Sequence, residues 1–103
     1  MGAWKGEKSV TLIRMRGEAQ LELRGQDAAS VWDARCERQK PHQFVCVGSG
    51  EEPGGGKLFI FRSTMQFNAG GIEENWTVED GRPGAKAVSG ADLLQRMVPP
   101  SVR

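Results

Sequence analysis

The run KLFIFRSTMQF, residues 57–67, constrains the fold of this chain more than any other segment. Every second residue along it points the same way in an extended chain, and this face is largely apolar: Phe59, Phe61, Ser63, Met65 and Phe67. The opposite face begins with Leu58 and Ile60 and becomes polar from Arg62 onwards. A repeat of two residues is typical of a β-strand. The run therefore predicts a long strand with one face in the core and the other increasingly exposed to water.

Shorter alternating runs predict four more strands. SVTLIRMR (9–16) and AQLELR (19–24) are separated only by Gly17-Glu18, so they predict an antiparallel hairpin. QFVCVG (43–48) precedes the long strand, and NWTVE (75–79) follows it after a glycine-containing break at 68–71. Antiparallel pairing between neighbours in the chain is therefore expected to dominate the sheet.

Two segments show spacing that is typical of helices. In the first, over about 27–39, Asp27 is placed to accept hydrogen bonds as an N-cap and Pro41 follows the end. Its apolar stripe is set by residues three and four apart: Ala28, Val31, Trp32, Arg35 and Cys36. In the second, ADLLQRMV (91–98), Ser89 and Asp92 resemble a capping box, and the expected buried face contains Leu93, Leu94 and Met97.

These elements predict one small α+β domain in the order strand, strand, helix, strand, strand, strand, helix. A chain of 103 residues has room for a single domain. We expect a mostly antiparallel sheet of four to five strands with the helices packed on one face. The expected boundaries are an N-terminal arm at 1–8, the domain at 9–98 and a C-terminal tail at 99–103.

The glycine-rich segment FVCVGSGEEPGGGKLFIF, residues 44–61, invites comparison with a phosphate-binding loop. In a Walker A loop a glycine precedes Gly-Lys by four residues and a hydroxyl residue follows the lysine. Here Glu51 occupies the first position and Leu58 the last, and a strand rather than a helix follows Lys57. The segment therefore predicts a hairpin connection over Gly48–Gly56 and no nucleotide site.

Composition gives little support to most other function classes. The net charge of +1 provides no global reason to expect nucleic acid or an anionic membrane as partner. The N-terminus lacks the apolar core of a signal peptide, so a cytoplasmic location is the working hypothesis. Cys36 and Cys46 have neither metal-ligand nor redox spacing, and we expect free buried thiols, with a disulfide between them as the alternative. No cofactor or metal is expected.

Candidate catalytic groups do not form a recognisable constellation. His42 is the single histidine, and a pairing with Cys36 or Cys46 as nucleophile has no local signature. Asp33 and Glu37 lie one turn apart on the predicted helix, where exposed carboxylates are the simpler interpretation. We therefore expect a non-enzymatic binding or interaction protein.

The sequence is compatible with three kinds of partner: another protein, nucleic acid or a small ligand. The leading hypothesis is protein–protein contact, plausibly as a homodimer, over a candidate surface listed here in full: Trp4, Arg14, Arg16, Arg24, Arg62, Glu51 and Glu52. Nucleic acid bound by the strand arginines is the first alternative, and cross-strand pairing of those arginines with Glu18 and Glu22 competes with it. The second alternative is a small ligand, or an enzyme substrate, in a pocket lined by Trp32, His42 and Cys46.

Overall fold

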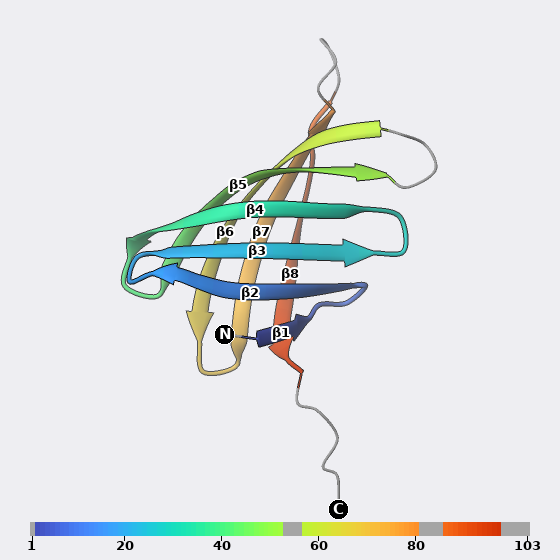
Figure 1. Ribbon diagram of the computed structural model, residues 1–103. Helices are drawn as coiled ribbons and strands as arrows, with labels where there is room; N and C mark the ends of the chain where they lie inside the picture. The colour runs from blue at the N-terminus through green and yellow to red at the C-terminus, as the bar shows by residue number, and fades with distance from the viewer. Residues whose placement is uncertain (1, 53–56, 81–85, 98–103) are drawn as a thin grey trace, which may run out of the picture.

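Eight antiparallel strands form a closed barrel in the computed structural model, which describes residues 2–52, 57–80 and 86–97. Each strand pairs with the next along the chain, and the last pairs with the first. In Figure 1, β2, β3 and β4 cross the front of the barrel, and β6, β7 and β8 run steeply behind them. The strands are β1 Gly2–Lys5, β2 Ser9–Gly17, β3 Gln20–Asp27, β4 Val31–Lys40, β5 Gln43–Glu52, β6 Lys57–Asn68, β7 Gly71–Asp80 and β8 Val88–Arg96.

The predicted α+β class is wrong, because the described residues contain strands and no helix. The segment predicted as the helix 27–39 is instead a hairpin arm. The Asp27 carboxylate does cap backbone amides, but those of Ala29 and Ser30 in a tight turn, at 2.8 and 2.7 Å. β4 then alternates, with Ala34 and Cys36 buried and their neighbours exposed. The sequence of this segment is compatible with a helix, but hydrogen-bonded pairing of β4 with both β3 and β5 makes it a strand.

The second predicted helix is also a strand. β8 covers most of the segment, and its register with β7 places Glu74 opposite Asp92 and Ile72 opposite Leu94. Only one of the three residues expected on a buried helical face is buried: Leu94 is fully buried, whereas Leu93 and Met97 are 46% and 43% exposed. Alternation with a period of two, rather than a helical stripe, accounts for that difference.

The barrel closes where β8 meets β1. Trp4 and Lys5 pair with Arg96 and Gln95, and the Met97 amide donates to the Ala3 carbonyl at 2.9 Å. The segment expected to be an N-terminal arm, 1–8, contains the barrel strand β1, which is paired on both sides. The expected C-terminal tail, 99–103, lies outside the described residues.

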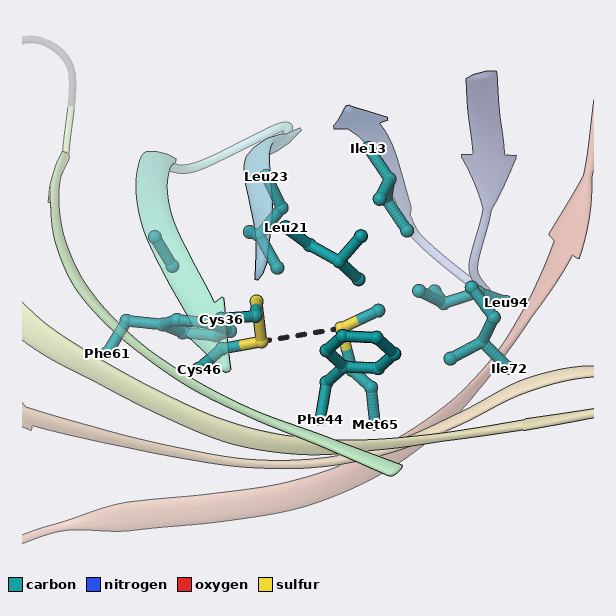
Figure 2. Close-up of a cluster of buried hydrophobic side chains, with 11 residues drawn as sticks. Ile13, Leu21, Leu23, Cys36, Phe44, Cys46, Phe61, Met65, Ile72 and Leu94 are labelled. Carbon is teal, nitrogen blue, oxygen red and sulfur yellow. Dashed lines mark hydrogen bonds between the residues drawn. A yellow bond between two sulfur atoms is a disulfide. The ribbon is translucent and has the colours of Figure 1, made fainter. Parts of the chain in front are cut away.

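Apolar side chains fill one part of the barrel interior. Figure 2 shows them converging from β2 to β8 around the sulfur atoms of Cys36, Cys46 and Met65. Fully buried members include Leu21, Leu23, Ile72 and Leu94. The inward face predicted for residues 57–67 is confirmed at Phe61, Ser63 and Met65, which are all buried. The prediction that the opposite face becomes more exposed along the strand is wrong, because Leu58 at its start is 68% exposed whereas Thr64 and Gln66 are half-buried.

Cys36 and Cys46 form a disulfide, so the expectation of free thiols is wrong for this structure. They lie directly opposite each other on β4 and β5, which a prediction of 27–39 as a helix could not reveal. The dashed contact of 3.6 Å from Cys46 Sγ to Met65 Sδ in Figure 2 is sulfur packing, because a disulfide sulfur carries no proton to donate.

The predicted hairpin around the glycine-rich segment is confirmed by ten register pairs between β5 and β6. β5 continues to Glu52 and β6 begins at Lys57, so much of the segment expected to be a loop is strand. Lys57 begins a strand, so no helix N-terminus is present there to bind a phosphate group. Within the described ranges, no helix is present that could cross a membrane.

Candidate ligand-binding cavity

Aromatic side chains line one end of the barrel interior, near the β1–β2 and β3–β4 turns. Trp32 from β4, Phe59 and Phe61 from β6, and Trp76 from β7 surround a cavity of about 250 Å³. Trp32 and Phe61 are stacked, with ring centroids 5.9 Å apart and planes 24° apart. Phe61 is also part of the apolar core, so the cavity has a packed floor.

Glycines on neighbouring strands provide the space for these rings. In register, Gly25 lies opposite Trp32, Gly50 opposite Phe59 and Gly90 opposite Trp76. A Cβ added at any of these three glycines would overlap ring atoms of its aromatic partner. Glycine inside a strand commonly marks such a close approach. The rings can therefore lie against the barrel wall, and the lumen between them stays open.

Glu74 places a carboxyl group in the same cavity. It projects inward from β7 and is only 7% exposed. Burial, and to a lesser extent the negative charge of Asp92, raise the pKa of Glu74 to about 7, while polar interaction with the Ser63 hydroxyl acts in the opposite direction. Among the described residues, no cation forms an ion pair with this carboxylate.

Ser63 is a second buried polar group beside Glu74. It is 4% exposed, and its hydroxyl oxygen has no hydrogen-bond partner of standard geometry in the described part of the chain. Its influence on Glu74 therefore comes from proximity rather than from a short hydrogen bond. Buried polar groups in proteins are normally satisfied, so the Ser63 hydroxyl beside Glu74 is an exception among the described residues.

Two more carboxylates at the cavity organise its rim. Asp92 accepts from the backbone N–H of Glu7 through both oxygens, at 3.1 and 3.2 Å, and so attaches the β1–β2 turn to β8. Asp27 holds the β3–β4 turn through its bonds to Ala29 and Ser30. Glu7 and Lys8 are exposed at the same rim. In the described part of the rim, carboxylates thus outnumber the single ammonium group, that of Lys8.

The residues predicted to line a pocket do not come together. Trp32 lines the cavity. His42 lies in the β4–β5 turn, exposed and with a φ of 66°, and does not border the cavity. Cys46 is buried in the core, and its sulfur is bonded to Cys36, so it has no thiol that could act as a nucleophile.

The candidate interaction surface is also dispersed. Trp4 is half-buried and packs edge-on against Phe67, with centroids 6.3 Å apart, away from the residues of the cavity. Glu51 and Glu52 are exposed at the end of β5. These residues do not form one continuous patch with the arginines of β2 and β3.

The outward-facing arginines are mostly paired with carboxylates. Arg14 and Arg16 reach Glu22 at 3.1 and 3.4 Å, which confirms the cross-strand pairing predicted with that residue. The hydrogen bond from Arg14, with the positive charges of Arg16 and Arg35, lowers the pKa of Glu22. Arg24 reaches Asp33 at 2.9 Å.

Arg62 lies apart from the other three arginines, on β6, where it is exposed. Two strands, β4 and β5, separate it from β3 in the barrel. The four arginines therefore do not form a single basic face of the kind that phosphate binding favours.

Sequence reasoning missed Glu74, Phe59, Trp76 and Asp92 as residues of a site. The signal was present in GIEENWTVED, where Ile72, Glu74, Trp76 and Val78 share one face. A strand predicted from 75 excludes Glu74. When the strand is extended back to Gly71, the same alternation places the carboxylate of Glu74 between Ile72 and Trp76 on the inward face.

The described residues contain no group of three or more potential ligands arranged to hold a metal ion. Comparison of the chain with protein-family models, with curated proteins and with solved structures finds no match. The case for a function therefore depends on the geometry of the barrel and its cavity.

Proposed function

We propose that this protein is a non-catalytic binding protein that holds a small organic ligand in the aromatic cavity of its barrel. The observation that carries the proposal is the set of glycine–aromatic pairs that keeps the cavity open. Small-molecule sites are concave, mostly apolar and contain a few polar groups, and barrel mouths are a common place for them. The aromatic walls and the buried carboxyl group of Glu74 fit that description.

The cavity volume indicates the size of ligand. A dry apolar cavity of about 150 Å³ accepts benzene. The cavity here is about 250 Å³. A single ring with a compact substituent therefore fits, and the interior of an eight-stranded barrel is wide enough for one small ligand where side chains do not fill it.

Protein–protein contact, the leading expectation from the sequence, has weaker support. The outer faces of β5 and β6 expose several apolar side chains, among them Val47 and Ile60. In register, however, Val47 lies opposite Arg62, and Ile60 lies opposite Ser49. Polar side chains thus interrupt the apolar ones, and we place ligand binding first.

The test uses the chain's own tryptophans. Two of the three line the cavity, Trp32 and Trp76, and Trp4 does not. In ¹H–¹⁵N NMR spectra with the indole signals assigned by Trp→Phe variants, we expect single-ring compounds to shift the indole N–H resonances of Trp32 and Trp76. The Trp4 resonance is the internal control and should stay in place. Shifts confined to Trp4, or no shift with any neutral or charged single-ring compound, would contradict the proposal.

A further inference from the structure

We propose that the ligand carries one positive charge, as an organic ammonium ion with a compact apolar body, and that the carboxylate of Glu74 binds this charge. The inference rests on the proposed function, because it assigns a chemical class to the ligand of the same cavity. Three features of the described residues lead to it: a buried acid without a cation, aromatic walls, and an acidic rim.

The first feature is the burial of Glu74 without a countercharge. A carboxyl group that is 7% exposed loses most of its hydration, and such groups are normally paired with a cation. No lysine or arginine of the described chain forms that pair. The position of Glu74 on the cavity surface lets a ligand supply the missing charge.

The second feature is the nature of the wall. Trp32 and Trp76 present indole rings to the cavity, and indole faces attract cations more strongly than other aromatic side chains do. Aromatic enclosures of this kind are used for quaternary ammonium groups. A metal ion is a poorer candidate, since no set of three suitable ligands exists among the described residues.

The third feature is the charge around the opening. Among the described residues that line the cavity, Glu7, Asp27 and Asp92 are acidic and Lys8 is the one basic residue. An excess of one sign around a cleft raises the local concentration of ligands of the opposite sign. A cation is therefore favoured during approach and after entry.

The same arrangement makes binding depend on pH. Among the described residues, the charged groups that line the cavity with Glu74 are Asp92 on β8, Glu7 and Lys8 on the β1–β2 turn, and Asp27 on β3, and the lining residues of β4 and β6 are uncharged aromatic side chains. Because burial raises the pKa of Glu74 to about 7, this carboxyl group gains its negative charge near neutral pH. Affinity for a permanent cation should therefore increase as the pH rises through 7.

The experiment compares three single-ring compounds of similar size by isothermal titration calorimetry. Phenyltrimethylammonium is a permanent cation, tert-butylbenzene is its neutral isostere, and benzenesulfonate is an anion. At pH 8 we expect the cation to bind at least about tenfold more tightly than the neutral compound. Its affinity should fall roughly tenfold from pH 8 to pH 6 as Glu74 takes up a proton, and that of the neutral compound should not.

Two matched variants locate the charge. Glu74→Gln keeps the side-chain size and should reduce the preference for the cation to less than about threefold. Glu73→Gln changes the exposed neighbour on the same strand and should leave the preference unchanged. Equal preference in Glu74→Gln and wild type would overturn the role of Glu74.

The wild-type titrations decide the ligand class independently of any variant. Equal binding of the cation and the neutral compound at pH 8, or tighter binding of benzenesulfonate, overturns the cation assignment while the proposed function stands. If none of the three compounds binds, and none shifts the indole N–H resonances of Trp32 and Trp76, the proposed function itself fails.

Discussion

Glu74 shows how much one residue can determine in a small barrel. Its neighbours at the inward positions of β7 are Ile72, which is fully buried, and Trp76, so an apolar side chain would suit the position. Burial of the carboxyl group costs stability whenever the group is ionised. Residues of this kind are common at functional sites, where stability is lost in exchange for activity.

That cost predicts how stability varies with pH. The pKa of Glu74 is raised from 4.5 to about 7 in the folded state, so the native state holds the proton more tightly than the unfolded state does. Stability from this group is therefore fully present below pH 4.5 and is lost as the pH rises to about 7. The expected loss in the free energy of unfolding is about 3 kcal/mol.

Urea denaturation at pH 4.5 and pH 8 measures this loss as a difference between variants. In Glu74→Gln the free energy of unfolding should not show the decrease of about 3 kcal/mol between pH 4.5 and pH 8, so this variant should be more stable than wild type at pH 8. Glu73→Gln, whose side chain is exposed, is the control and should follow wild type. Identical pH dependence in Glu74→Gln and wild type would show that the Glu74 carboxyl group is not buried as described.

At the scale of elements, the pair of facing strands is the unit that builds the cavity. Three aromatic residues of the wall each lie against a glycine of an adjacent strand, as Trp76 of β7 does against Gly90 of β8. Cross-strand pairs of this kind contribute to sheet stability and also fix the direction of the larger side chain.

Replacement of the glycine should therefore close the cavity. In Gly90→Ala the added methyl group overlaps the ring of Trp76, which must move into the lumen. We expect a loss of about 1–3 kcal/mol in the free energy of unfolding. Binding of phenyltrimethylammonium should weaken at least tenfold, by roughly the 1.4 kcal/mol that this factor represents.

Gly17→Ala is the matched control. No atom lies within 4 Å of a Cβ added at Gly17, so stability should change by less than about 1 kcal/mol and binding should be unaffected. Calorimetry on both variants makes the comparison. Wild-type affinity in Gly90→Ala would mean that Trp76 does not shape the site.

The strands differ in how clearly their sequences predict them. Residues 57–67 alternate over a long run and include large apolar side chains, so strand and buried face were both predicted. Residues 31–40 contain Trp32 and Cys36 at a spacing that also suits a helix, and the small Ala34 between them weakens the alternation. Local patterns cannot decide such a segment, because its conformation depends on partners on both sides. The same ambiguity led to the prediction of a helix in place of β8, because Leu93 and Leu94 are adjacent apolar residues of which only Leu94 is buried.

At the scale of the whole molecule, the two errors in predicted helices explain the wrong fold class. The antiparallel hairpins were predicted, but a sheet of five strands needs another layer to cover its apolar face, and helices were assigned to that role. Once both segments are strands, β1 and β8 can pair and the sheet encloses its own apolar face. The cavity could not be predicted before this closure, since Trp32 and Glu74 come from strands on different sides of the barrel.

A crystal structure of the protein soaked with phenyltrimethylammonium tests this account most directly. We predict an eight-stranded barrel with the ring of the compound between Trp32 and Trp76 and its trimethylammonium group toward Glu74. A helix over residues 27–39, or the compound bound on the outer surface with an empty lumen, would contradict it.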